Sequence, residues 1–191
     1  MEGENPMPDA KNSAIALFRE QLRNAHQLLE GTMAAVTQQE AHWAPPGIAT
    51  PLGATYAHIV ISEDGTVNGL LKGAAPLFGS NWAGKAGVSE LPPMANPNSP
   101  GFPDWSSWSR RVKVDLAKMR EYAQAVFSAT DQYLASLTDE DLTRPVSLAA
   151  LGLGESTLGY ILTSGLLGHA FSHTGEISCL KGLQGKRGHP V

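Results

Sequence analysis

The spacing of apolar residues constrains the fold of this chain more than any other feature. Apolar side chains recur every three or four positions over residues 13–37, 52–72, 105–137 and 158–183. This spacing places them on one stripe of an α-helix. Helices that each carry one such stripe bury it most simply against one another. We therefore expect an all-α four-helix bundle, and we find no convincing strand.

The residues at the ends of these segments fit helix boundaries. Side chains that can cap a helix precede the four segments: Ser13, Thr50, Asp104 and Ser156. Thr50 is followed directly by proline, which is a favoured order at a helix start. The Pro45-Pro46-Gly47 stretch cannot continue a helix, so residues 38–50 form a connection. Gly185 offers a stop for the last helix.

A long insertion separates the second and third helices. Residues 74–103 contain six prolines and many Gly, Ser and Asn residues, so they form a loop. Loops of this length often shape binding pockets, and Trp82 and Phe102 would then be the residues that contact a ligand. We favour the plainer alternative, in which the loop covers the bundle and packs its aromatic side chains onto it.

The composition narrows the class of protein. With 191 residues, of which 42% are apolar, the chain can form one hydrophobic core. We expect a single domain over residues 1–185 and a flexible tail over residues 186–191. The net charge of −4 argues against nucleic-acid binding, and no apolar run is long enough to cross a bilayer. The single cysteine, Cys179, fits a reducing compartment, so we expect a cytoplasmic protein.

Two histidines on the last helix are the first candidates for chemistry. His169 and His173 are four residues apart, so their side chains lie one turn apart on one face. They share a seam with Leu162, Leu166 and Leu180 that should face the interior of the bundle. Burying two imidazoles is costly unless each finds a hydrogen bond, a charge partner or a metal ion. A shared metal ion would meet that need, and ordinary hydrogen bonds are the alternative.

His58 supplies a third candidate ligand. A lone histidine near a helix start is more often an ordinary surface or core residue. Its neighbours one and two turns further on are apolar or small, which leaves room for an ion and a water: Ile61, Ser62, Gly65 and Gly69. A catalytic zinc-type centre usually takes three protein ligands and keeps one position open. We therefore predict a divalent metal site formed by His58, His169 and His173.

Glu176 is the candidate catalytic residue. It lies three residues after His173 and shares its face of the helix. It can orient His173 as a hydrogen-bond acceptor, or it can carry a proton. A solvated glutamate near a helix end is an equally good interpretation.

Other residues that could attract attention receive structural interpretations. Cys179 lies six residues after His173 and points away from that histidine's face, so we expect a buried apolar residue. Trp105 and Trp108 look like core or dimer anchors. Three histidines without partners at ligand spacing are expected to face solvent: His26, His42 and His189.

In the order of these motifs, the chain resembles members of the DinB/YfiT-like superfamily of bacterial metalloproteins. The likeness rests on Ala57-His58-Ile59-Val60 in the second helix and on the segment from His169 to Ile177 in the last. It implies an up-down-down-up four-helix bundle, often dimeric, with a nickel or zinc ion. The residues that match the family's three ligands are His58, His169 and His173. The chain departs from the common pattern at Thr174, at Glu176 and in the 74–103 insertion.

Three roles follow for such a centre. A metal ion with an open position can lower the pKa of a bound water and support hydrolysis of a small molecule. It can instead deprotonate a low-molecular-weight thiol for transfer, an activity that the wider family also suggests. A metal that only ties two helices together is less natural, because structural zinc sites are usually closed by four residues. We expect a hydrolase-type centre first, acting on a small molecule in a homodimer.

Overall fold

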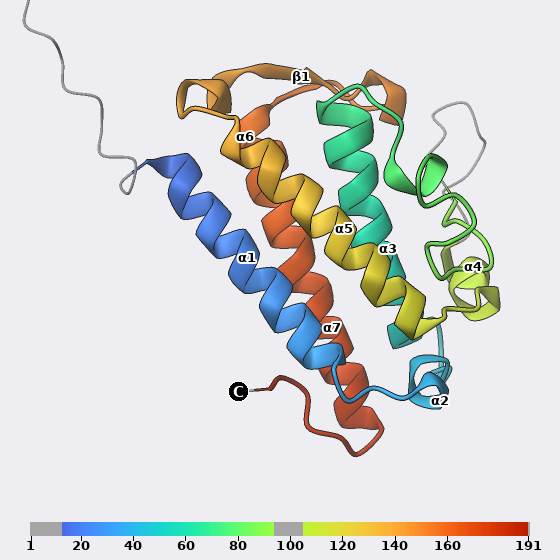
Figure 1. The fold of residues 1–191 in the computed structure, drawn as a ribbon. Helices are drawn as coiled ribbons and strands as arrows, with labels where there is room; N and C mark the ends of the chain where they lie inside the picture. Colours follow the sequence, from blue (N-terminus) through green and yellow to red (C-terminus); the bar gives the residue numbers. More distant parts are fainter. Residues whose placement is uncertain (1–12, 94–104, 191) are drawn as a thin grey trace, which may run out of the picture.

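The protein is built on four long helices. A computed structural model describes residues 13–93 and 105–190. The helices are α1 (Ala14–Met33), α3 (Leu52–Asp64), α5 (Leu116–Ala135) and α7 (His169–Leu183). Figure 1 shows α1 and α7 running in one direction and α3 and α5 in the other, which is the up-down-down-up order. The predicted all-α four-helix bundle is confirmed.

The helices surround an apolar interior. α1 and α3 each pack against both α5 and α7. The side chains buried between them belong to the predicted stripes, and the largest include Leu22, Leu29, Met33, Met119 and Leu162. Full burial of one such side chain contributes roughly 1.5–3 kcal/mol. The stripes therefore stabilise the bundle as the sequence indicates.

The first helix is shorter than the sequence predicts. Ser13 caps α1 as expected, because its Oγ accepts a hydrogen bond from the first turn. The helix ends at Met33, and Thr37 instead starts a short helix, α2 (Gln38–Ala41). Thr37 Oγ1 accepts from the Glu40 N–H while the Glu40 carboxylate accepts from the Thr37 N–H. Because of this reciprocal capping box, Thr37 is the N-cap of α2 and not the last residue of the first helix.

The second helix has the predicted extent but a different start. The residue before its first turn is Pro51 rather than Thr50, and no side chain caps that turn. Beyond Asp64 the helix continues as a π-helical segment, η1 (Gly65–Leu71). π-helical turns are rare and often lie near functional sites.

One predicted helix is two helices in the structure. The expected helix over residues 105–137 divides into α4 (Trp105–Arg111) and α5, joined by an extended stretch. In that stretch Val114 forms an antiparallel β-bridge with Val88. Asp115 then caps α5 by accepting hydrogen bonds from two backbone N–H groups of its first turn. The β-bridge and the capping aspartate interrupt the helix, so the prediction of one helix is wrong. The proposed cap Asp104 lies outside the described residues.

A small hairpin lies across one end of the bundle, at the top of Figure 1. Strand β1 (Pro145–Ser147) pairs antiparallel with β2 (Glu155–Thr157), so the expectation of no strand is wrong. Each strand has three residues, which is too short to show the alternation of apolar and polar side chains that predicts a strand. Ser156 lies in β2, and Thr157 caps the helix that follows. That helix runs as α6 (Leu158–Tyr160), the π-helical η5 (Ile161–Gly168) and α7. The described residues also form short 3₁₀ turns: η2 (Leu77–Gly79), η3 (Glu140–Thr143) and η4 (Ala149–Leu151).

The first part of the long insertion, residues 74–93, is held by buried groups of the bundle. Asp64 is fully buried and accepts hydrogen bonds from two backbone N–H groups of η2 and from Tyr122 Oη. The ring of Trp82 lies 5.7 Å from that of Tyr122. This part of the loop covers the bundle, as we favoured. Phe102 lies outside the described residues.

The three histidines expected at the surface are all at least half-buried. His26 is buried, and its Nε2 lies 2.9 Å from Glu63 Oε2. His42 is half-buried, and its Nε2 accepts a hydrogen bond from the Val114 N–H. His189 is also half-buried. The expectation fails because each ring has a partner from a distant part of the chain: Glu63 for His26, Val114 for His42 and Thr32 for His189.

The outward face of α7 corrects a further expectation. Cys179 lies on it and is exposed, so it is not the buried apolar residue that the sequence suggested. A helix that is apolar or small nearly all round does not reveal which face is buried. Over the described ranges, 13–93 and 105–190, no helix combines the length and apolar character needed to cross a bilayer.

Candidate metal centre

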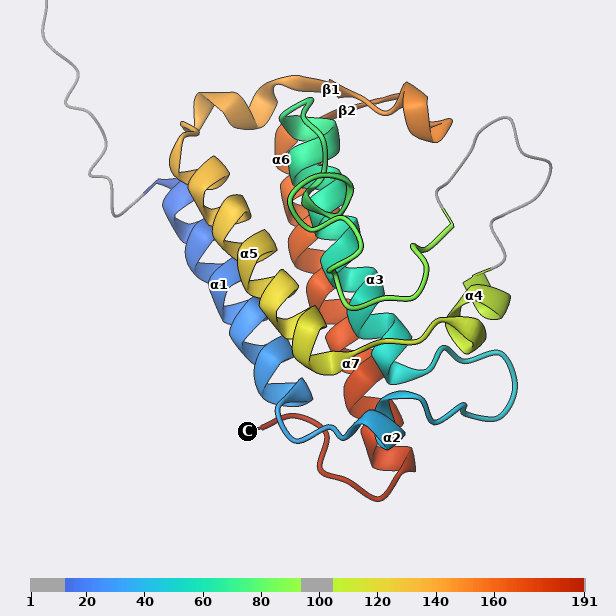
Figure 2. The same ribbon diagram turned by 45° about the vertical axis from the view of Figure 1, so that its right-hand side comes forward.

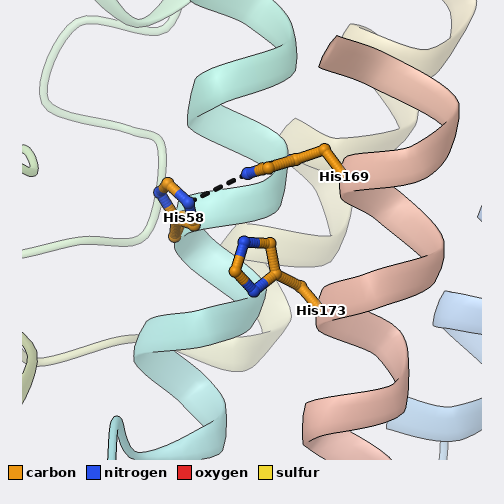
Figure 3. Close-up of side chains that lie close together, drawn as sticks. All are labelled: His58, His169 and His173. Carbon is orange, nitrogen blue, oxygen red and sulfur yellow. Dashed lines mark hydrogen bonds between the residues drawn. The ribbon is translucent and has the colours of Figure 1, made fainter. Parts of the chain in front are cut away.

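The structure brings the three predicted ligands together from two neighbouring helices. His58 lies on α3, and His169 and His173 lie on the first two turns of α7. Figure 3 shows the three rings facing one another in the space between these helices. One nitrogen from each ring can be chosen so that the three lie within 4.8 Å of one another. All three side chains are half-buried.

The local helix geometry explains this convergence. His169 and His173 are one turn apart, so their rings point the same way, with centroids 4.4 Å apart. α3 packs directly against α7 and presents His58 to both of them. The centroid of His58 lies 4.8 Å from that of His169 and 5.0 Å from that of His173.

Two of the rings, those of His58 and His173, have a partner at Nδ1, which we call the outer nitrogen because it faces away from the cluster. These contacts orient the rings. His173 Nδ1 lies 2.6 Å from Glu176 Oε2, and because a carboxylate only accepts, His173 donates from Nδ1. In the neutral ring, Nε2 then keeps its lone pair. His58 Nδ1 lies 3.1 Å from Ser62 Oγ, a hydroxyl that can accept in the same way. His58 Nε2 and His169 Nε2 face each other at 2.9 Å.

The surroundings keep two of the rings neutral. Burial, together with a smaller effect of the neighbouring His173, lowers the pKa of His58 to about 4. Burial also lowers the pKa of His169 to about 3, with smaller contributions from His58 and His173. A metal ligand must be the neutral imidazole. Each of these two neutral rings therefore has one nitrogen lone pair that a metal ion can bind.

The donor set fits a divalent metal ion. Two nitrogens bound to one zinc ion at about 2.0–2.1 Å in tetrahedral geometry lie roughly 3.3 Å apart. The observed separations, 2.9 Å for the closest pair and at most 4.8 Å for the group, bracket that value. In the part of the chain that the structure describes, no fourth His, Cys, Asp or Glu side chain joins the group. Three ligands of this kind leave room for an exchangeable one.

A pocket opens beside the cluster. It has a volume of about 380 Å³, and its walls include His58, His173 and Glu176. Trp105 and Trp108 form an aromatic wall, and the edge of Trp105 meets the His58 ring at a centroid distance of 4.6 Å. A volume of this size is in the lower range of small-molecule sites.

Sequence reasoning missed two residues of this site. Ser62 was considered only for its small size, although its position one turn after His58 predicts contact with that ring. Trp105 packs against the core, as one of its two predicted roles requires, but the sequence does not indicate that it also lies half-buried beside His58. No local pattern indicates this, because the break between α4 and α5 sets its position. Trp108 is buried in the core, as one of the two proposed roles requires.

The fold and the site together define a class of protein, an up-down-down-up four-helix bundle with three histidines gathered between two of its helices. The chain belongs to the DinB superfamily, whose family model matches residues 21–177. It is also similar to the crystal structure of a conserved protein from Enterococcus faecalis, with 22% identity and a TM-score of 0.68. That match covers 91% of this chain and 99% of the other, and at this identity it shows the fold alone. No curated protein matches the chain.

Proposed function

We propose that His58, His169 and His173 bind one divalent metal ion, zinc or nickel, and that the centre hydrolyses a small molecule held in the adjoining pocket. The observation that carries this proposal is the convergence of three imidazoles, from two helices, at the edge of a pocket of about 380 Å³. A divalent ion with three imidazole ligands supplies Lewis acidity at its open position and activates water near neutral pH.

The side chains around the cluster have separate tasks. Ser62 and Glu176 hold the outer nitrogens of His58 and His173, so that the inner nitrogens point at the ion. Glu176 also lines the pocket and is exposed, so its carboxylate can accept a proton from water there. Trp105 and Trp108 exclude water from one side of the pocket and offer an apolar surface to the substrate.

Two other roles remain as competing outcomes. A low-molecular-weight thiol would lose its proton at the same open position and become a nucleophile for transfer. The carboxylate of Glu176 in the pocket favours hydrolysis, because attacking water needs a proton acceptor. A purely structural metal would require a fourth protein ligand, and the described residues supply three.

The first test is the spectrum of protein loaded with cobalt(II). We expect the visible absorption of a low-symmetry nitrogen-bound cobalt site in wild-type protein, and its loss in His58→Ala, His169→Ala and His173→Ala. His189→Ala is the matched control, because this histidine is not part of the cluster. Azide should shift the spectrum, since an exchangeable position is open. An unchanged spectrum in the three variants, or no response to azide, would contradict the proposal.

The second test separates hydrolysis from thiol transfer. Zinc-loaded protein is assayed with p-nitrophenyl acetate and p-nitrophenyl phosphate, and separately with a low-molecular-weight thiol and 1-chloro-2,4-dinitrobenzene. We expect hydrolysis that falls to background in His169→Ala and about 10²-fold or more in Glu176→Gln, the range for losing a general base. Thiol conjugation without hydrolysis would replace the hydrolase assignment with a thiol transferase.

A further inference from the structure

A second pocket lies far from the metal centre, where α1 and α7 end. Its volume is about 350 Å³, and its walls come from α1, α2, α3, α7 and the C-terminal segment. We call it the tail pocket. Lys181, one of its residues, follows His169 by twelve positions on α7. At about 1.5 Å per residue, Lys181 lies roughly 18 Å along the helix from His169 and roughly 12 Å from His173, the nearer ligand.

The C-terminal segment forms one wall of the tail pocket because several contacts fix it. Gly185, with a φ of 71°, turns the chain back after α7. Lys186 Nζ then lies 2.9 Å from Glu40 Oε1 on α2. Lys181 Nζ donates hydrogen bonds to the carbonyl oxygens of Thr32 and Gly188. In Figures 1 and 2 this segment folds back toward the end of α1.

Positive charge gathers in the tail pocket. Three cations line it, Lys181, Lys186 and Arg187, against one carboxylate, Glu40, which already pairs with Lys186. The Arg187 side chain is exposed and has no hydrogen bond or ion pair within the described residues. The half-buried His189 adds a polar ring. This local excess contrasts with the chain's net charge of −4, so it marks a site for an anion.

Lys181 is the most deeply placed of these cations. Its residue is only 9% exposed, and burial lowers the pKa of its ammonium group. Two carbonyl oxygens are its hydrogen-bond partners, and neither carries a formal charge. An ammonium has three donors, so one donor is left for an anionic ligand.

The tail pocket also has apolar walls and a helix start. Val36 and Leu52 are buried side chains that line it, together with Ala35 and Pro190. Leu52 is the first residue of α3, whose first turn has no side-chain cap. The N-terminus of a helix carries partial positive charge and unpaired N–H groups. The start of α3 therefore adds partial positive charge to that of the cations. The apolar walls suit a short hydrocarbon chain or a ring.

We propose that the tail pocket binds a small organic anion that has a carboxylate or phosphate head and a short apolar body. The head lies among Arg187, Lys181 and the start of α3, and the body lies against Val36 and Pro190. This site is separate from the metal centre and does not depend on the function proposed there.

The test is a titration of full-length, chelator-treated protein with four probes. Hexanoate and phenyl phosphate carry the proposed head and body, 1-hexanol lacks the charge, and inorganic phosphate lacks the body. Amide shifts in a ¹⁵N–¹H spectrum locate the binding through Gly31 and Gly188, which line the tail pocket. We expect hexanoate, phenyl phosphate or both to bind and to shift these two amides, and the two controls to bind at least tenfold more weakly. The head group of the tighter probe identifies the anion.

One variant of the tail pocket and two control variants make the test decisive. Arg187→Ala should weaken binding roughly tenfold or more, as expected for a lost charge-assisted hydrogen bond. Arg144→Ala, which removes an exposed arginine at the hairpin end, should bind as the wild type does. His58→Ala should also bind normally, because the metal centre is not involved. Equal binding of hexanol and hexanoate, no binding of either acid, or full affinity in Arg187→Ala would overturn the proposal.

Discussion

At the scale of single residues, the partner of the outer ring nitrogen decides how a histidine can act as a ligand. Glu176 fixes His173 and Ser62 contacts His58, so both rings present Nε2 to the cluster. The spacing of His169, His173 and Glu176 places all three on one face, so this half of the site could be predicted from the sequence alone. Glu63, the partner of His26, and Val114, the partner of His42 Nε2, are remote in sequence, and no local pattern could reveal them.

Glu176 yields the first prediction at this scale. Replacing it with alanine removes the acceptor for His173 Nδ1, so the ring loses its preferred orientation and basicity. We expect zinc affinity to fall roughly 10–100-fold, the usual effect of losing such a partner. Competition with a chromophoric chelator measures it. Glu155→Ala, an exposed change on β2, is the control, and wild-type affinity in Glu176→Ala would show that the contact does not support the centre.

Asp64 yields a prediction about stability. Its buried carboxylate accepts hydrogen bonds from Tyr122 Oη, from Asn68 Nδ2 and from the start of the loop. Asp64→Ala leaves these donors without an acceptor, so we expect the free energy of unfolding to fall by about 3 kcal/mol or more. Tyr122→Phe removes one bond and should cost about 1 kcal/mol. Urea denaturation checks both, with the exposed Glu121→Ala expected within about 0.5 kcal/mol of wild type. A loss below about 1 kcal/mol in Asp64→Ala would contradict this role.

At the scale of elements, apolar spacing predicts where helices exist better than where they are interrupted. The stripes of α1, α3, α5 and α7 follow the expected pattern. Asp115 caps α5 from within a segment that is predicted as one continuous helix, and Thr37, the last residue of the predicted first helix, caps α2 instead. The π-helical segments η1 and η5 keep an apolar spacing close to that of an α-helix, so the sequence does not distinguish them.

The capping box of α2 leads to a pH-dependent prediction. Hydrogen bonding to Thr37, together with Lys186, lowers the pKa of Glu40 from 4.5 to about 2. A carboxylate whose pKa is lowered in the folded state stabilises it above pH 4.5, and this contribution is lost as the pH falls toward 2. Glu40→Gln keeps an amide acceptor but removes the charge. We expect wild type to be more stable than Glu40→Gln at pH 6, with a difference that shrinks as the pH drops. Urea denaturation at several pH values checks this, and a constant difference would contradict it.

At the scale of the whole molecule, topology completes the site. Because 111 positions separate His58 from His169, no local spacing links the two residues. From the sequence, His58 can be proposed as a ligand only because the pair on the last helix needs a third ligand and because the motif resembles the family. The up-down-down-up order places α3 beside α7 and so joins the two halves. The hairpin and the fixed C-terminal segment depend on equally distant contacts, and their sequences are too short to predict them.

The outward face of α7 supports a prediction about assembly. Among the exposed residues from Tyr160 to Leu183, Glu176 is the only charged one, and Phe171 is 40% exposed. Uncharged faces with large apolar side chains are typical of contacts between copies. We expect a homodimer, with twice the chain mass of 20.2 kDa in light scattering coupled to size exclusion. Phe171→Glu should shift it toward monomer, whereas Leu17→Glu on α1, at a site 60% exposed, should not. A wild-type monomer would contradict the prediction.

The most direct test of the whole account is an anomalous-difference map from crystals of protein loaded with zinc or nickel, recorded at the absorption edge of the metal. We expect one strong peak between α3 and α7, at bonding distance from a nitrogen of each of His58, His169 and His173. A peak elsewhere, or none at this position in fully loaded crystals, would contradict it.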